Sequence, residues 1–540
     1  MPPSSVRRRL RPLGCTLLAL LLGSVVSGCQ PPRPPGLLIL ASRSRVDSLD
    51  PVSASRVGVL QLLAGLGDPL YSVEADGRIQ PRLAAALPRL SPDGLRATLR
   101  LRPGVRFHDG TPFNAAALAF SLRRFMALGT LGYQLSDRVR AVHVRGPLEL
   151  ELELKHRFSP LPRLLSAIFL TPVSPTAYRR HRSSPWGEGF VGTGPYRLSF
   201  FSNQQVRLLP WEGYWGPRPR NSGLVVVNLS NSTALYGALR SGEVDLLLAN
   251  GLEIDHQQAL RREAIAGRLK EAVGPAMNIG LLSLRSDQPP LADPRLRQAL
   301  ARSLDRRTLS QRVSLGLRPP LRQLVPPSLP GSDPGAWPAY DPQGARRLFR
   351  QAGYCRGRAL ELPLTFRSDV PSDRLFALTW QAQVRRDLGD CLRLQVSGME
   401  STTAYDQLGK GTLPLFFYDW SGDYPDAENF LMPLLSCEQR RGDRCLKGNS
   451  ALSGSFWSAP GLETQLIDSS SLEGPARQAL LRTIQRRSAA ASPYLPVWLM
   501  APVVWAQSSL DTPRFDGAGW LRLSELRRLA APAGTGPRHP

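Results

Sequence analysis

The sequence has very little lysine, and its positive charge is too widely spread for a nucleic-acid binding surface. Lysine and arginine together number 68, against 43 acidic residues, yet only four of them are lysine. Phosphate binding needs clustered basic side chains, often with a zinc-finger, RNP-like or basic-arm pattern, and none of these patterns occurs. The formal net charge of +25 therefore indicates a chain-wide preference for arginine on a solvated surface, and we expect no nucleic-acid partner. The lysines are Lys155, Lys270, Lys410 and Lys447.

Histidine is also scarce, and the motifs of common enzymes are missing. The six histidines are widely spaced, so a histidine metal cage is not expected. They are His108, His143, His156, His181, His256 and His539. The sequence has no HExxH, GxSxG or P-loop motif. We therefore expect no enzyme activity, no cofactor and no protein-bound metal. Of the six, His108, beside an Asp-Gly turn, is the histidine with the strongest case for a functional role.

Apolar runs long enough to approach a bilayer span are missing from all but the N-terminus. There, four arginines within residues 7–11 precede an apolar run over residues 13–26 and then Ser27-Gly28-Cys29. A basic segment, a short apolar core and small residues predict a signal peptide over residues 1–28. Cys29 resembles the lipobox cysteine of bacterial lipoproteins, so we expect a lipid anchor there, with a plain cleaved signal as the alternative. Residues 29–36 are rich in proline and predict a stiff tether.

Cysteine is used sparingly after the signal, with four residues left in the expected mature chain. In an exported protein disulfide pairing is the default, and four thiols allow three connectivities. We expect Cys355 with Cys391 and Cys437 with Cys445, because each pair brackets a locally closing segment. A metal site is the alternative, but the spacings are not CxxC-like and no histidine is near.

The rest of the chain alternates strand-like and helix-like segments. At 540 residues it should form two or three packed units. Residues 148–154 alternate Leu and Glu as in a half-buried strand, and Asn114 is a helix cap before an amphipathic stretch at 115–126. Residues 224–248 have a βαβ-like pattern, and similar alternation continues in the second half, so we expect mixed α/β layers. The Gly192-Thr193-Gly194 pair is a weak cofactor signal, because Pro195 blocks the helix that a dinucleotide site needs.

Several motifs, in order along the chain, carry a family resemblance. They are Phe107-His-Asp-Gly-Thr-Pro-Phe-Asn-Ala115, Val191-Gly-Thr-Gly-Pro-Tyr196, Ala238-Leu-Arg-Ser-Gly-Glu-Val-Asp245, Asp293-Pro-Arg-Leu-Arg-Gln-Ala-Leu300 with Asp305-Arg306, and Asp419-Trp-Ser-Gly-Asp-Tyr-Pro-Asp426 with Asn429-Phe430. Together they resemble the family 5 extracellular solute-binding proteins of peptide, nickel and related importers, over about residues 50–499. Ala117-Leu118 and the stiff pairs Pro319-Pro320 and Pro326-Pro327 depart from the family pattern.

The resemblance implies an α/β, two-lobed periplasmic-binding-protein fold (type II, cluster C) with an extra N-proximal subdomain. Lobe I would combine 37–70, 188–275 and 490–528, the extra subdomain would take 71–187, and lobe II would take 276–489. Residues 529–540 would form a flexible tail. The crossovers near 273–277 and 489–496 would form a hinge.

The same resemblance implies candidate ligand-binding residues. Asp423 matches the aspartate that accepts a peptide ligand's α-ammonium group, although it can also merely shape the turn before Pro425. Trp420, Tyr424 and Tyr418 would line side-chain pockets, or equally lie in the core. Residues 192–194 and 277–280, with Gly194 and Asn278, would offer strand edges to the peptide backbone. Asp426 is expected to be a helix N-cap.

The function implied is that of the extracytoplasmic substrate-binding component of an ABC importer. It would bind peptides in an interlobe cleft, act as a lipid-anchored monomer and deliver its ligand to permease subunits. The alternatives are a receptor for another small solute, such as an oligosaccharide, an opine or a metal chelate, and a basic envelope-associated binding protein. A secreted hydrolase would show turnover in place of stoichiometric binding.

Overall fold

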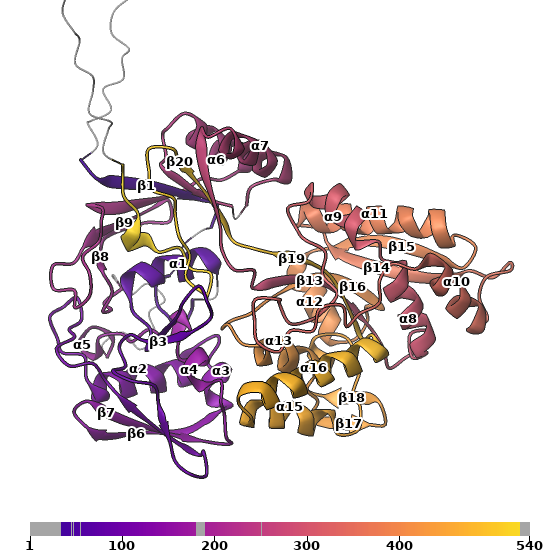
Figure 1. Cartoon of the computed structure of the whole chain (residues 1–540), viewed down its shortest axis with the longest axis horizontal. Helices are drawn as coiled ribbons and strands as arrows, with labels where there is room; N and C mark the ends of the chain where they lie inside the picture. The colour runs from indigo at the N-terminus through magenta and orange to yellow at the C-terminus, as the bar shows by residue number, and fades with distance from the viewer. Residues whose placement is uncertain are drawn as a thin grey trace, which may run out of the picture.

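A computed structural model describes residues 34–529, except 45, 47, 55, 180–189 and 250. The predicted signal peptide, Cys29, most of the tether and residues 530–540 lie outside the described residues. The molecule has two halves, one with a seven-stranded and a four-stranded sheet and the other with a five-stranded sheet (Figure 1). Of the helices described, none combines the length and hydropathy that crossing a bilayer requires.

The seven-stranded sheet and its helices are called the first lobe here. Its strands, in spatial order, are β12 (Leu269–Val273), β20 (Val503–Gln507), β11 (Leu246–Leu248), β1 (Leu37–Ser42), β10 (Gly223–Asn228), β9 (Gln205–Pro210) and β8 (Tyr196–Phe201). Its helices are α1 (Val57–Leu66), α6 (Ser232–Arg240), α7 (Ile254–Ile265) and the short η2 (Leu523–Glu525). β1 lies parallel to both β10 and β11. A parallel arrangement needs a crossover connection, and α6 supplies it, as the βαβ pattern predicted.

The four-stranded sheet and the short elements beside it are called the subdomain. Its strands are β4 (Arg89–Leu90), β5 (Arg96–Arg100), β7 (Glu149–Leu154) and β6 (Val139–Gly146), with the separate pair β2 (Tyr71–Val73) and β3 (Ile79–Pro81). Its helices are α2 (Ala115–Leu128), α3 (Tyr133–Ser136), α4 (Leu161–Leu164), η1 (Ile168–Leu170) and α5 (Pro175–Tyr178). Asn114 caps α2 by accepting a 2.9 Å hydrogen bond from Ala117 N. The leucines of β7 are buried on one face, as their alternation predicted.

The five-stranded sheet and its helices form the second lobe. The strands, in spatial order, are β15 (Leu392–Met399), β14 (Leu360–Arg367), β16 (Leu415–Ser421), β13 (Asn278–Leu284) and β19 (Tyr494–Met500). The helices are α8 (Pro294–Ser303), α9 (Arg306–Ser314), α10 (Pro342–Gln351), α11 (Pro371–Leu388), α12 (Ser401–Gly409), α13 (Glu428–Leu435), α14 (Asn449–Leu452), α15 (Leu462–Ser471) and α16 (Gly474–Ala491), and β17 (Gln439–Arg441) pairs with β18 (Arg444–Lys447). β14 is parallel to both β15 and β16. The chain passes from β14 to one neighbour and then across to the other, so a topological switch point lies beside β14.

The chain crosses between the lobes twice, and the second expected crossing was misplaced. The first runs from β12 to β13, as predicted near residues 273–277. The return was expected near 489–496, but β19 pairs with β13 in the second lobe and the chain leaves only after Met500. Figure 1 shows this yellow segment running from β19 to β20. Gly274 N donates a 2.8 Å hydrogen bond to Pro502 O, so the two crossing segments are joined to each other.

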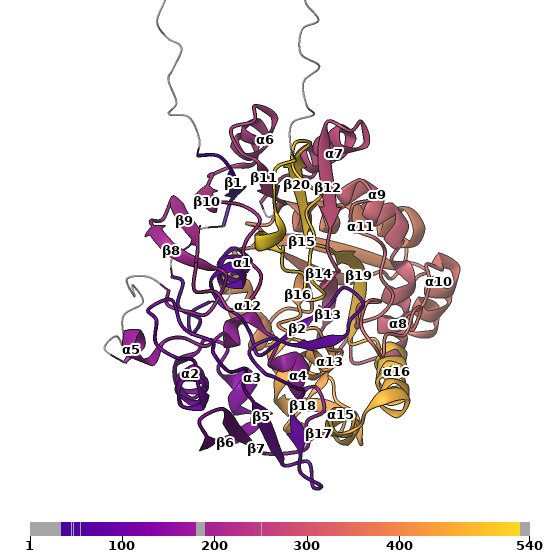
Figure 2. The same cartoon turned by 60° about the vertical axis from the view of Figure 1, so that its left-hand side comes forward.

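Each half of the molecule has its own large apolar core. One combines the first lobe with the subdomain, and the other fills the second lobe. A smaller core lies between the seven-stranded sheet and helices α6 and α7. The turned view places α6 and α7 at one end of the molecule and the four-stranded sheet at the other (Figure 2).

Candidate functional site

The loop that follows β16 connects the second-lobe sheet to α13 and folds back on the start of that helix. Trp420 Nε1 donates a 2.9 Å hydrogen bond to Asn429 O. Asp423 N donates a 2.7 Å hydrogen bond to the side-chain oxygen of Asn429. A single asparagine therefore orders both the strand end and the turn that carries Asp423.

Asp423 lies at the boundary between the second lobe and the subdomain. Its Oδ2 accepts a 2.7 Å hydrogen bond from Gln134 Nε2 on α3. Among the described residues, its Oδ1 accepts no hydrogen bond. Burial raises the pKa of Asp423 to about 6, against a smaller lowering effect from Gln134 and Arg138. The carboxylate is therefore mostly ionised at neutral pH, with one oxygen open to a donor. Tyr133, whose side chain is half exposed, stands beside it.

The loop is held against the subdomain by buried charges. Arg138 pairs with Glu428 at 2.6 Å, and Arg163 Nη1 donates a 3.0 Å hydrogen bond to Pro425 O. Asp426 is buried and pairs with Arg477 of α16 at 2.6 Å. It also accepts a 2.9 Å hydrogen bond from Glu428 N, the first residue of α13. The N-cap position itself is taken by Ala427, one residue after the predicted one. These contacts fix the position of the loop between the two halves of the molecule.

Two of the aromatic residues expected to line pockets lie in the cores. Tyr418 is 3% exposed, stacks on Phe416 at 5.5 Å between ring centroids and belongs to the second-lobe core. Tyr424 is 1% exposed, and its hydroxyl donates to Glu428. Its ring belongs to the core of the first lobe and subdomain, although the chain reaches it from the second lobe. Of the two alternatives for these residues, pocket wall or core, the structure supports the core, because their rings are enclosed by apolar neighbours. Trp420 stays partly exposed.

The prediction that Gly194 and Asn278 offer free strand edges to a peptide is also wrong. Gly194 is buried, its N donates to Leu66 O at 3.0 Å, and its O contacts His108 Nε2 at 3.1 Å. Asn278 begins β13, which is paired with β16 on one side and with β19 on the other. The main-chain groups of Gly194 and both sides of β13 are therefore already paired and offer no free edge to a peptide. The contact with Gly194 O indicates a structural role for His108.

A cluster of charges lies at the switch point of the second-lobe sheet, and sequence reasoning missed it. Arg367, at the end of β14, pairs with Asp373 and with Asp419, each at 2.6 Å. Burial, followed by the charge of Asp419, holds the pKa of Asp373 well above its usual range. Ligands of open α/β sheets bind outside the carboxyl ends of strands at such a point. The available signal was that Arg367 directly follows the strand-like run Leu360-Glu-Leu-Pro-Leu-Thr-Phe366.

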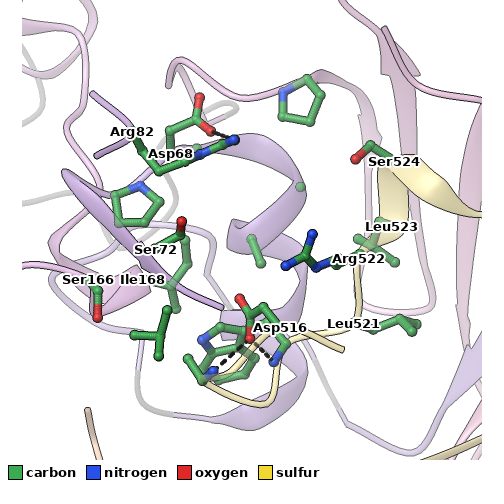
Figure 3. A pocket seen from close by; sticks show the side chains of 18 of the residues that line it. Asp68, Ser72, Arg82, Ser166, Ile168, Asp516, Leu521, Arg522, Leu523 and Ser524 are labelled. Atoms are coloured by element: carbon green, nitrogen blue, oxygen red, sulfur yellow. Dashed lines mark hydrogen bonds and ion pairs between the residues drawn. The ribbon is translucent and has the colours of Figure 1, made fainter. Parts of the chain in front are cut away.

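A separate cavity of about 160 Å³ lies wholly within the first lobe and the subdomain (Figure 3). Asp68 and Arg82 form a 2.8 Å ion pair on one side of it. On the other side Asp516 accepts hydrogen bonds from Ala518 N and Trp520 N. No residue of the second lobe lines this cavity, so it is distinct from the boundary where Asp423 lies.

The four cysteines form two disulfide bonds with the expected connectivity. Cys355 is bonded to Cys391, and Cys437 to Cys445. Within the described part of the chain, the grouping of metal-binding residue types consists of Cys355, Asp390 and Cys391. Both of its sulfurs are in the disulfide, so it offers no thiolate to a metal.

Comparison with known proteins places the chain in a family. The model of bacterial extracellular solute-binding proteins, family 5 Middle, matches residues 78–442. The glutathione-binding protein GsiB of Escherichia coli (strain K12) is 26% identical over 413 residues, covering 74% of this chain and 78% of GsiB. A dipeptide binding protein from Pseudoalteromonas sp. SM9913 in complex with Met-Leu matches with a TM-score of 0.75 and 21% identity, over 91% of this chain and 100% of that chain. NikA from Brucella suis in complex with Fe(III)-EDTA matches with a TM-score of 0.79 and 21% identity over the same shares.

The two solved structures show the two-lobed fold expected from the sequence. The family model spans well over half of the chain, so it decides membership as well as fold. This chain belongs to the bacterial extracellular solute-binding proteins, family 5, and is the substrate-binding component of an ABC importer and not an enzyme.

Proposed function

We propose that this protein binds short peptides between its two lobes, with Asp423 receiving the ligand's α-ammonium group. The observation that carries the proposal is the open Oδ1 of a half-buried, ionised carboxylate at the boundary of the lobes. A charge-assisted hydrogen bond from an ammonium group to such an oxygen contributes about 1.5–3 kcal/mol. Tyr133, beside Asp423, and Trp420, three residues before it, are both partly exposed and would provide aromatic surface for a ligand side chain.

The relatives support a peptide as the ligand class. GsiB is named for glutathione, and the Pseudoalteromonas protein holds Met-Leu. Both ligands carry an ammonium and a carboxylate group on a short peptide chain. The same two features are what Asp423 and the charge cluster around Arg367 would recognise.

The protein acts, in this proposal, as a monomer anchored outside the cytoplasmic membrane through Cys29. The basic N-terminus, the apolar run and the small residues before Cys29 support this assignment. Replacing Cys29 by serine is expected to release the protein from the membrane fraction, as a fractionation blot would record. Persistence of the serine variant in that fraction would contradict the anchor.

The ligand assignment is tested by calorimetry on the mature protein with dipeptides, tripeptides and their N-acetylated forms. Asp423→Asn is expected to weaken binding of free-amine peptides by about tenfold or more and to leave binding of acetylated forms unchanged. Asp443→Asn, at an exposed aspartate of the second lobe, serves as the matched control. Absence of binding to any peptide, or equal affinities for the wild type and Asp423→Asn, would refute the assignment.

A further inference from the structure

A second cavity, of about 280 Å³, lies on the first lobe and is called the arginine pocket here. Main-chain hydrogen bonds fix its walls to one another. Arg220 N donates a 2.8 Å bond to Ser524 O, and Asp511 N donates a 3.0 Å bond to Arg527 O. The cavity is therefore a built feature of the lobe. It is lined by Arg220 and by residues 511–514 and 525–527.

Both carboxylates of the arginine pocket already have an arginine partner. Asp511 pairs with Arg527, and Glu525 pairs with Arg522 at 3.1 Å. The hydrogen bond from Arg527 lowers the pKa of Asp511, so this carboxylate is ionised at neutral pH. Each of the two negative charges is thus neutralised by an arginine other than Arg220 and Arg514, the remaining cations of the pocket wall.

The side chains of Arg220 and Arg514 are exposed and have no anionic partner. Among the described residues, neither guanidinium makes a hydrogen bond or an ion pair. After the hydrogen bond from Arg527, the charges of Lys270 and Arg220 also lower the pKa of Asp511, so Lys270 adds a further cation near the pocket. Guanidinium groups bind phosphate oxygens in pairs through parallel donors. Free arginines around a cavity therefore suit a phosphate group.

The arginine pocket lies beside the point where the tether joins the first lobe. Ser222 comes two residues after Arg220, at most about 7 Å along the chain. Its N donates a 3.1 Å hydrogen bond to Gly36 O, and its Oγ donates a 2.7 Å bond to Pro35 O. The six residue steps from Cys29 to Pro35 span at most about 22 Å. With Cys29 acylated, this part of the lobe is therefore within reach of the bilayer surface.

We infer that the arginine pocket binds the phosphate of an anionic phospholipid headgroup and so docks the first lobe on the membrane. The inference rests on the proposed anchor at Cys29 for placing the pocket at a bilayer. Two arginines bind a headgroup weakly, but a short tether raises the local headgroup concentration to about the millimolar range. At 0.15 M salt, charges are screened over about 8 Å, so a protein without the anchor is still expected to leave the membrane.

Vesicle sedimentation of the unlipidated Cys29→Ser protein tests the pocket without the anchor. At about 20 mM salt, where screening is weak, we expect about fivefold more binding to phosphatidylcholine vesicles with phosphatidylglycerol than to vesicles without it. Adding Arg220→Gln and Arg514→Gln should remove this preference. The matched control is Arg350→Gln with Arg385→Gln, which removes two exposed arginines of α10 and α11 and should keep the preference.

Equal losses in the two pairs of variants would show that net charge alone drives the binding, and would overturn the inference. Absence of any preference for phosphatidylglycerol would overturn it as well. In a second arm, calorimetry with inorganic phosphate replaces the vesicles. Phosphate binding tighter than about 1 mM that needs Arg220 and Arg514 would assign the pocket to a soluble phosphate and overturn the lipid source. Neither arm uses the anchor, so its failure in the fractionation experiment is read separately.

Discussion

Gln134 on α3 donates a 2.7 Å hydrogen bond to the carboxylate of Asp423, across the boundary between the subdomain and the second lobe. Gln134 is only 2% exposed, so its amide is held in place by its surroundings. The subdomain thus orients the residue that we assign to the ligand's ammonium group. Tyr424, next along the chain, inserts its ring into the core of the first lobe and subdomain. The same short loop therefore carries both the residue proposed to bind the ligand and a contact between the two halves.

Peptide affinity should fall as the pH drops through about 6, the pKa to which burial raises Asp423. An ammonium ligand needs the ionised carboxylate and lowers its pKa in the complex, so binding is full above that pKa and lost below it. The groups that face Asp423 are Gln134, Tyr133 and Arg138, and none of them titrates between about pH 5 and pH 7. Calorimetry over that range checks the profile. Asp423→Asn should flatten this acid limb, and a limb that persists in this variant would assign it to another group.

Removing the Asp426 carboxylate should destabilise the protein strongly. Asp426→Ala leaves the buried guanidinium of Arg477 without its partner and removes a charge near Arg163. Breaking a buried pair in this way costs about 3–5 kcal/mol in the free energy of unfolding, measured by denaturant titration. Asp406→Ala is the control, because its partner Lys410 is exposed, and it should change little. Similar effects of the two variants would show that the ion pair between Asp426 and Arg477 does not stabilise the fold.

The two disulfides should contribute unequally to stability. The Cys355–Cys391 bond closes a loop with a sequence separation of 36, and the Cys437–Cys445 bond one of 8. Loop-closure entropy assigns about 4 kcal/mol to the longer loop and about 2.5 kcal/mol to the shorter one. Paired alanine variants, compared by denaturant titration under oxidising conditions, check the order. A larger loss from the 437/445 pair would contradict an account based on chain entropy.

Gly274, in the first crossing segment, should not tolerate a side chain. A Cβ there would lie 2.8 Å from Phe515 Cγ and 2.8 Å from Pro502 Cγ, closer than carbon atoms approach without displacement. Gly274→Ala is expected to lower the free energy of unfolding by about 1–3 kcal/mol, as thermal and denaturant unfolding would record. Gly237→Ala in α6 meets nothing within 4 Å and removes a helix-interior glycine, so it should be neutral or stabilising. Equal stability of the wild type and Gly274→Ala would show that the crossing segments move apart at little cost.

Local chemistry made several elements predictable. Asn114 needed only the following turn to cap α2, and the Leu/Glu alternation of β7 already separates a buried from an exposed face. The ordered motifs between residues 107 and 430 were enough for the family, and hence for the two-lobed fold. Each of these signals depends on residues close together in the chain.

Strand pairing was predictable only in part. The apolar run of β19 is a buried strand, but its residues do not show which sheet it joins. The expected return to the first lobe at residue 490 failed because β19 pairs with β13, more than 200 positions earlier in the chain. A buried strand carries little information about its partner beyond the requirement for apolar neighbours.

The sequence by itself determined the family, the α/β layers and the helix cap at Asn114, because these follow from short patterns of polarity and backbone preference and from ordered motifs. The assignment of Asp423 to ligand binding follows from the family resemblance and stays a prediction. Only the tertiary structure decided that Tyr418 and Tyr424 are core residues, that Gly194 and Asn278 have no free edge, and that Arg318 lies over Trp498. The reason is physical, since burial and electrostatic environment are set by neighbours far away in the chain, and a side chain's own identity does not specify them.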